Sequence, residues 1–302
     1  MKNKSLISIT DFSKKEYLEI LDLAEEFEKQ PVQNIANGKV VATLFFEPST
    51  RTRLSFESAA NRMGAKVIGF SDASSSSTSK GESLVDTIKT VSCYADIIVM
   101  RHPLEGAARL ASEVASVPII NAGDGANQHP TQCMLDLYSI RKTQNTLDNL
   151  NIALVGDLKY GRTVHSLVEA MCNFNTVFHL ISPESLKLPS SVKMRINEKK
   201  LKYYQYREIQ DAIDKVDILY MTRVQRERFL DIQDYEKVKN TYILDYSMLA
   251  KTKPQMKILH PLPRVNEINT NVDNTPQAYY FQQAQNGVYV RQALIAAILA
   301  LK

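Results

Sequence analysis

The chain reads FFEPSTRTR at residues 45–53. The apolar run that leads into this stretch, residues 39–46, has the length and composition of a buried strand, and Pro48 turns the chain. Residues 51–62 then have the apolar spacing of a helix. A strand, a short turn and a helix in direct succession are typical of the β-α-β unit that builds parallel sheets. The stretch therefore predicts an α/β fold.

The same alternation continues on both sides of this stretch. Upstream, Ser13 and Glu16 have the spacing of a capping box at the start of an amphipathic helix. Downstream, the pattern predicts strands at residues 66–70, 96–100 and 117–121, and helices at 83–94 and about 131–141. It then restarts, with strands expected at 151–156, 177–181, 218–221, 242–245 and 257–259, and helices at 162–172, 209–216 and 288–301.

A chain of 302 residues is long for one hydrophobic core, so two domains are expected. Because the β-α alternation restarts after the helix at about 131–141, the second series predicts a second domain. Each domain is expected to be a parallel β-sheet flanked by helices.

Composition excludes several classes of protein. With 44% apolar and 23% charged residues the chain is not disordered, and a net charge of +4 is too small for a general nucleic-acid surface. The longest apolar run, residues 293–301, is half the length of a membrane span, and no signal-peptide core follows the first residues. We therefore expect a cytoplasmic protein that contacts neither membrane nor nucleic acid.

The three cysteines, Cys93, Cys133 and Cys172, are far apart and form no CxxC pair. This spacing predicts reduced thiols, with neither a disulfide framework nor a zinc site.

Residues 49–52 combine a serine, two threonines and an arginine at a helix start. Free backbone N–H groups at such a position favour an anion, and these side chains add hydroxyl and guanidinium donors. The alternative is that Ser49 or Thr50 only caps the helix. Capping accounts for one hydroxyl but not for Arg51 beside it.

Other polar segments have two readings each. Residues 74–79 are all serine or threonine and precede Lys80, so they are either a surface loop or a mobile lid over an anion. His129 is either structural or part of a ligand site, and Arg101 is either a surface ion-pair partner or a ligand contact, since ligands bind at strand ends in open α/β sheets. Arginines 223, 226 and 228 are either a solvated basic face or carboxylate ligands. Residues 156–161 lack the spacing of a dinucleotide-binding loop.

The residues 49–53, STRTR, resemble the carbamoyl-phosphate motif of the aspartate/ornithine carbamoyltransferase family. Five further segments resemble the aspartate branch of that family, in the family's order and at similar spacing: RHP at 101–103, QHPTQ at 128–132, GDLKYGRTVH at 156–165, TRVQ at 222–225 and HPLPR at 260–264. The resemblance covers most of the chain. It implies two domains, residues 1–146 plus 282–302 for carbamoyl phosphate and residues 147–281 for aspartate, with the active site in the cleft between them and at a subunit interface.

The resemblance also assigns roles. The residues it implies for carbamoyl phosphate are Ser49, Thr50, Arg51, Thr52, Ser76, Lys80, Arg101, His129, Gln132, and Leu262 with Pro263. Among them Arg51, Thr52, Lys80, Arg101, His129 and Gln132 would be catalytic, with Thr52, Arg101 and His129 equivalent to an oxyanion hole. The residues implied for L-aspartate are Lys80, Arg162, Thr163, Arg223 and Gln225, whose guanidinium groups suit its two carboxylates.

The implied reaction gives N-carbamoyl-L-aspartate and phosphate, the committed step of de novo pyrimidine biosynthesis. It requires no metal and no organic cofactor. The resemblance further implies a homotrimer in which Lys80 and a loop serine reach a neighbour's site, and it leaves regulatory chains possible. Two alternatives remain open: an ornithine-type carbamoyltransferase, although Pro261 stands where that branch has cysteine, and a non-catalytic scaffold on the same fold.

Replacing Arg51 by alanine tests the anion reading of residues 49–52. We expect turnover with carbamoyl phosphate to fall roughly 100-fold or more, because a preorganised cation at developing charge is lost. Steady-state kinetics with a folded variant measures this. Turnover close to that of the unaltered chain would leave capping as the role of the segment.

Overall fold

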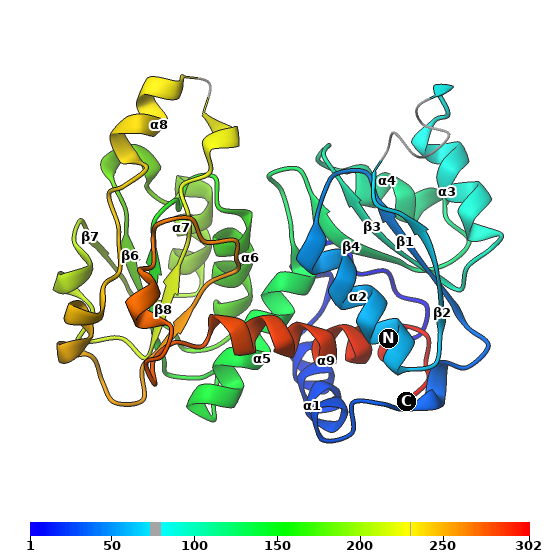
Figure 1. Cartoon of the computed structure of the whole chain (residues 1–302), viewed down its shortest axis with the longest axis horizontal. Helices are drawn as coiled ribbons and strands as arrows, with labels where there is room; N and C mark the ends of the chain where they lie inside the picture. The colour runs from blue at the N-terminus through cyan, green and yellow to red at the C-terminus, as the bar shows by residue number, and fades with distance from the viewer. Residues whose placement is uncertain (73–79, 230) are drawn as a thin grey trace. The chain divides into compact units, whose positions relative to one another are not determined.

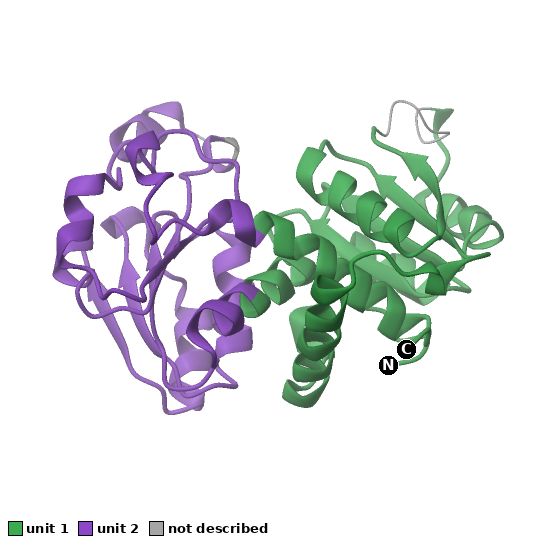
Figure 2. Ribbon diagram, turned by 60° about the horizontal axis from the view of Figure 1, so that its bottom comes forward, with its two compact units in different colours: residues 1–138, 284–302 green, residues 139–283 purple. Residues whose placement is uncertain are grey.

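The computed structural model describes residues 1–72, 80–229 and 231–302. The chain divides into two compact units (Figure 2). Unit 1 contains Met1–Tyr138 and Ala284–Lys302, and unit 2 contains Ser139–Gln283. Each unit has its own parallel sheet, as the alternation of strands and helices predicts.

Unit 1 is built on a four-stranded sheet in the order β2-β1-β3-β4 (Figure 1). Its strands are β1 (Val40–Phe45), β2 (Lys66–Phe70), β3 (Ile97–His102) and β4 (Ile119–Asp124), and every pairing is parallel. Its helices are α1 (Lys14–Lys29), α2 (Thr50–Arg62), α3 (Leu84–Ser92), α4 (Ala107–Val114) and the first part of α5 (Pro130–Gln144). Helix α2 packs on β1 and β2, whereas α4 packs on β3 and β4.

Both faces of the central strands of unit 1 are covered. In β1, Ala42 and Leu44 alternate with Val41 and Phe45, and all four side chains are buried. Burial on both faces explains why this strand is a continuous apolar run in the sequence and does not alternate between apolar and polar residues.

The last helix, α9 (Tyr280–Ile298), starts at the end of unit 2 and continues from Ala284 in unit 1. The backbone N–H of Asn3 donates to the carbonyl of Ile298 at 2.9 Å, and Gln292 donates to the carbonyl of Pro31, also at 2.9 Å. The two termini of the chain therefore lie close together in unit 1 (Figures 1 and 2).

Unit 2 is built on a five-stranded sheet in the order β7-β6-β5-β8-β9, again parallel throughout. Its strands are β5 (Asn151–Val155), β6 (Val177–Ile181), β7 (Tyr203–Tyr206), β8 (Ile218–Met221) and β9 (Lys257–Leu259). Its helices include α6 (Arg162–Met171), α7 (Ser190–Glu198) and α8 (Ile232–Val238). Ala153, Val155, Leu219 and Ile258 from three neighbouring strands share one apolar core.

Two sequence predictions in unit 2 are wrong. Residues 209–216 are not an α-helix, because only Ile209–Asp211 form a single 3₁₀ turn and further turns follow. Residues 242–245 are not a strand, because Leu244 forms only an isolated bridge to Ile268. Both segments bury apolar side chains in the unit 2 core. Their apolar pattern reflects this burial, which does not require a regular helix or strand.

The predicted capping box and free thiols are confirmed. Ser13 caps α1 with Glu16 as its capping-box partner. The three cysteines are free thiols, Cys93 exposed and the other two buried. Within the part of the chain that the structure describes, none of the helices is long and apolar enough to cross a membrane.

Two glycines with positive φ give a matched test of unit 1 packing. At Gly69 in β2, φ is +148°, and an added Cβ would lie 2.0 Å from the carbonyl oxygen of Thr43 in β1. At Gly38, φ is +80° and no atom lies within 4 Å of the added Cβ.

We expect Gly69→Ala to lower the free energy of unfolding by about 3 kcal/mol or more, since the two paired strands must separate locally. Gly38→Ala has only the backbone penalty of about 1 kcal/mol. Urea unfolding of both variants measures the difference. Equal losses would mean that β1 and β2 are not packed as described.

Candidate active site

The predicted carbamoyl-phosphate residues of unit 1 follow three neighbouring strands. β1 and β4 both pair with β3, so the carboxyl ends of the three strands lie side by side at one edge of the sheet. Phe45 in β1 pairs with Arg101 in β3, and the N–H of Phe46 donates to the carbonyl of Arg101 at 2.9 Å. This edge is where ligands bind in open parallel sheets.

The β1–α2 connection presents the first residues of the set. Helix α2 starts at Thr50 with Ser49 as its N-cap, and the Ser49 side chain accepts no capping hydrogen bond in the described structure. Thr50 and Arg51 are exposed, whereas Thr52 is buried. Capping therefore does not account for the Ser49 hydroxyl, and the first turn of the helix keeps the character of an anion site.

Arg101 forms an ion pair, as one of its two readings proposed, but the partner belongs to the candidate site. Its Nε donates to the Glu47 carboxylate at 2.7 Å, and its side chain is only 16% exposed. Glu47 lies in the same connection as Ser49. The pair therefore fixes Arg101 beside the anion-binding turn instead of leaving it on an open surface.

His129 and Gln132 lie where β4 passes into α5, and both are buried. His129 directly precedes α5, and its carbonyl accepts from the N–H groups of Gln132 and Cys133. Both side chains thus belong to the first turn of a helix that starts at the same sheet edge as Arg101.

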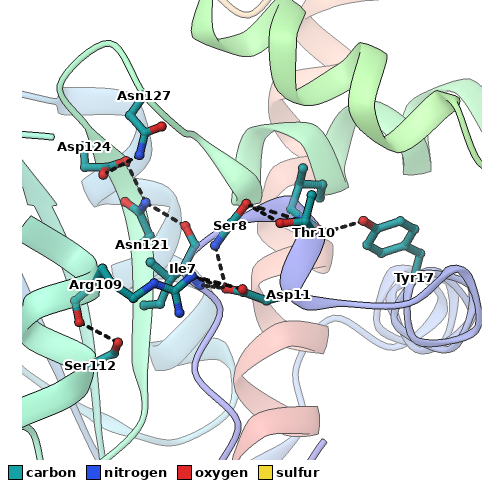
Figure 3. A network of polar contacts seen from close by, with 11 residues as sticks. Ile7, Ser8, Thr10, Asp11, Tyr17, Arg109, Ser112, Asn121, Asp124 and Asn127 are labelled. Atoms are coloured by element: carbon teal, nitrogen blue, oxygen red, sulfur yellow. Dashed lines mark hydrogen bonds and ion pairs between the residues drawn. The ribbon is translucent and has the colours of Figure 1, made fainter. Parts of the chain in front are cut away.

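The loop before His129 is held by a carboxylate that sequence reasoning missed. Asp124, at the end of β4, is 1% exposed and accepts hydrogen bonds from Asn121 and Asn127 (Figure 3). It accepts a third from the N–H of Gln128. It also accepts from the N–H of Gly106 at 3.0 Å. Asn121 extends the network to the carbonyl of Ile7 (Figure 3). Asp124 therefore fixes the course of the chain into His129.

The remaining two predicted residues of unit 1 are less defined. Lys80 is exposed and immediately follows a gap in the described chain. Ser76, and the lid reading of residues 74–79, lie outside the described residues.

Unit 2 brings its predicted residues to one sheet edge in the same way. Arg162 and Thr163 begin α6 after β5, Arg223 and Gln225 follow β8, and Leu262 with Pro263 follows β9. β8 lies between β5 and β9, so the three connections are neighbours. The Gln225 side chain donates to the carbonyl of Tyr160 at 3.2 Å and joins the first two connections.

A buried carboxylate also lies behind this edge. Asp157 is 0% exposed and accepts from the N–H of Tyr160 at 2.9 Å. Burial raises the pKa of Asp157 above its usual value, although the backbone N–H groups of Tyr160 and Gln225 oppose the shift. Asp157 thus holds together the connections that carry Arg162 and Gln225.

The loop that carries Leu262 and Pro263 rests on a buried histidine–glutamate pair. His260 Nε2 and Glu267 Oε1 are 2.7 Å apart, and His260 Nδ1 accepts from the N–H of Leu262 at 2.7 Å. Nδ1 is therefore the unprotonated nitrogen, and Nε2 carries the proton toward Glu267. Leu262 has φ of +56°, a left-handed conformation that this support maintains.

Burial and hydrogen bonding act in opposite directions on Glu267. Burial alone would raise its pKa, but hydrogen bonds from His260 and from the N–H of Val265 lower the pKa below its usual value. The carboxylate is therefore held in its charged form at neutral pH.

Comparison with known proteins places both units in one family. The profile described as aspartate/ornithine carbamoyltransferase, carbamoyl-P binding domain, matches residues 4–142, and the profile of the Asp/Orn binding domain matches residues 148–298. The chain belongs to the aspartate/ornithine carbamoyltransferase family.

Individual relatives agree along the whole chain. It is 64% identical to the aspartate carbamoyltransferase catalytic subunit of Phocaeicola vulgatus over 302 residues, which are 100% of this chain and 96% of that protein. The solved catalytic subunit of M. jannaschii aspartate transcarbamoylase is 51% identical with a TM-score of 0.92, and 98% of each chain is covered. Trypanosoma cruzi aspartate transcarbamoylase, solved with carbamoyl phosphate and aspartate, is 37% identical with a TM-score of 0.94, covering 99% of this chain and 97% of that one.

The described residues contain no group of three or more histidine, cysteine, aspartate or glutamate side chains arranged to hold a metal ion. The cations at the two sheet edges are side chains of the protein: Arg51 and Arg101 in unit 1, Arg162 and Arg223 in unit 2.

Glu267→Gln tests the support of the Leu262 loop. A carboxylate with a lowered pKa contributes stability above its unfolded pKa of about 4.5, and this contribution is lost as the pH falls through the lower folded value. We expect the free energy of unfolding of the variant to be about 2 kcal/mol lower at pH 7. Below about pH 4.5 it should fall less steeply with decreasing pH than that of the unaltered chain.

Urea unfolding between pH 7 and pH 3 measures this. Glu236→Gln, which removes an exposed pair with Lys239, is the control and should stay within about 0.5 kcal/mol of the unaltered chain. An acid dependence identical to that of the unaltered chain would contradict the assignment.

Proposed function

We propose that this chain catalyses transfer of the carbamoyl group from carbamoyl phosphate to L-aspartate, giving N-carbamoyl-L-aspartate and phosphate. One observation carries the proposal: a hydroxyl- and arginine-rich helix start at the edge of one sheet, and two arginines at neighbouring strand ends of the other. The first suits a phosphate, and the second suits a molecule with two carboxylates. The names of the relatives support the same reaction.

In unit 1, the proposed roles follow the chemistry of carbamoyl phosphate. Ser49, Thr50, Arg51 and Thr52 bind the dianionic phosphate. Arg101 contacts phosphate and the carbonyl oxygen, and with Thr52 and His129 it stabilises the charge that develops on that oxygen. The amide of the substrate needs acceptors, which we assign to Gln132 and the backbone carbonyl of Leu262, next to Pro263.

In unit 2, the proposed roles follow the two carboxylates of aspartate. Arg162, with Thr163, binds the α-carboxylate, and Arg223, with Gln225, binds the side-chain carboxylate. Guanidinium groups bind carboxylates in bidentate fashion, so two of them select a dicarboxylate over ornithine, whose side chain ends in a cation. Asp157 supports both connections from behind.

The proposed reaction starts with ordered binding of the two substrates. Carbamoyl phosphate binds first and aspartate second. The neutral α-amino group attacks the carbamoyl carbon, a tetrahedral intermediate forms, and the C–O bond to phosphate breaks. The leaving phosphate accepts the proton from the amino group. Holding both substrates in this arrangement supplies a large share of the rate acceleration.

We propose further features of the working protein on the same basis. Three chains form a trimer in which Lys80 and Ser76 act on a neighbour's substrates, which requires a closed ring. The domain boundaries are residues 146/147 and 281/282, regulatory chains are possible partners, and the reaction serves pyrimidine biosynthesis in the cytoplasm. Three free thiols are typical of that reducing compartment.

An assay of the chain alone with carbamoyl phosphate and either L-aspartate or L-ornithine tests the proposal. We expect product with aspartate only. Product with ornithine would mean that the acceptor residues are misassigned, and no product with either would favour a scaffold or a missing partner.

Arg223→Ala sharpens the test. It should raise the KM for aspartate roughly 100-fold, because a bidentate contact to a carboxylate is removed, while binding of carbamoyl phosphate stays unchanged. Arg226→Ala, at an exposed position three residues further on, is the matched control and should leave both constants within about twofold.

A further inference from the structure

A buried carboxylate lies one helical turn behind Gln132. Asp136 is 0% exposed, and Gln132, also buried, donates from Nε2 to Asp136 Oδ1 at 2.9 Å. The two residues are four positions apart on α5, the spacing at which glutamine and aspartate side chains meet on a helix. The reaction as proposed above gives Asp136 no role.

This contact determines which end of the Gln132 amide faces the ligand. A carboxylate accepts hydrogen bonds and does not donate them, whereas a glutamine amide has one donor end and one acceptor end. The NH₂ group must therefore face Asp136. The carbonyl oxygen, Oε1, is left for the other side, where Gln132 offers an acceptor to a bound molecule.

A buried cation interacts with the charge of Asp136. Arg291 on α9 is 3% exposed, and its charge interacts with that of Asp136. Burial lowers the pKa of Arg291 to about 10, and the charge of Asp136 opposes this shift, so the guanidinium stays protonated at neutral pH. A nearby opposite charge favours the charged form of each partner.

Arg291 also contacts the helix that carries the phosphate-binding residues. Its Nη1 atom donates to the Ser55 hydroxyl at 3.0 Å, and its guanidinium carbon lies 4.9 Å from the centre of the Phe56 ring. Ser55 is one turn along α2 from Arg51. The same cation therefore contacts α2 and interacts electrostatically with the carboxylate that orients Gln132.

We infer that Asp136 is a positioning residue that fixes the Gln132 amide with its oxygen toward the donor substrate, and so selects an acyl phosphate that carries an NH₂ group on its carbonyl carbon. The inference rests on the proposed function, because it uses the assignment of Gln132 to carbamoyl phosphate. Acetyl phosphate has the same phosphate and carbonyl but a methyl group in place of NH₂. It leaves the Gln132 oxygen without a hydrogen bond and should bind less tightly.

Asp136→Asn removes the orienting charge while keeping the shape of the side chain. An asparagine can bond either end of the Gln132 amide, so the amide is free to turn. We expect the Kd of carbamoyl phosphate, measured by calorimetry on the full-length chain, to rise roughly tenfold, the value of one hydrogen bond. The Kd values of acetyl phosphate and inorganic phosphate should stay within about twofold, since neither ligand uses the amide.

Asp96→Asn is the matched control. Asp96 is a partly buried aspartate of unit 1 that accepts from Lys39 and the N–H of Val40, at the opposite end of β3 from Arg101. This variant should keep the preference for carbamoyl phosphate over acetyl phosphate.

A purely structural role for Asp136 would weaken all three ligands together, and no change in any Kd would likewise overturn the inference. If Asp136→Asn does not fold because Arg291 loses its counter-charge, the double variant Asp136→Asn/Arg291→Met removes the buried charges together, a change that folded proteins often tolerate. It should show the same selective loss. A chain that makes no carbamoyl aspartate would overturn the proposed function, whereas an active chain whose Asp136→Asn variant keeps its preference overturns this inference alone.

Discussion

Parallel strand pairing is the constraint on which the rest of the structure depends. Parallel strands end at the same edge of their sheet, so residues that follow successive strands become neighbours however far apart they are in the chain. In unit 1 this brings together connections that begin near residues 46, 102 and 124, and in unit 2 those near residues 156, 222 and 260. Each sheet thereby collects donors for an anion without any long loop having to fold back on itself.

The residues at these edges are arginines, threonines and amides, and those behind them are buried carboxylates. Asp124, Asp136, Asp157 and Glu267 are each at most 4% exposed, and each accepts hydrogen bonds from a segment that carries a proposed ligand-binding residue. A carboxylate can accept several N–H groups at once, which suits it to hold a loop in one conformation.

Sequence reasoning succeeded where the signal is local. The β1–α2 connection, the capping box of α1 and most strands were predicted because apolar periodicity and turn residues lie within a few positions of one another. It failed at residues 209–216 and 242–245, where apolar side chains serve the core from irregular backbone. It missed the edge strand β7, whose Tyr204 and Gln205 are exposed and interrupt the apolar pattern. The proximity of Arg291 to Ser55 could not be predicted either, since 236 positions separate the two residues.

The return of α9 to unit 1 has a consequence for how the chain is made. Unit 2 is one continuous segment, Ser139–Gln283, whereas unit 1 needs residues from both sides of it. A ribosome therefore delivers all of unit 2 before it delivers the part of α9 that supplies Arg291 and Gln292 to unit 1. Domains usually fold in the order of their synthesis, but unit 1 cannot be complete until the segment that forms unit 2 has been made. The unit whose synthesis begins first is therefore the unit that is completed last.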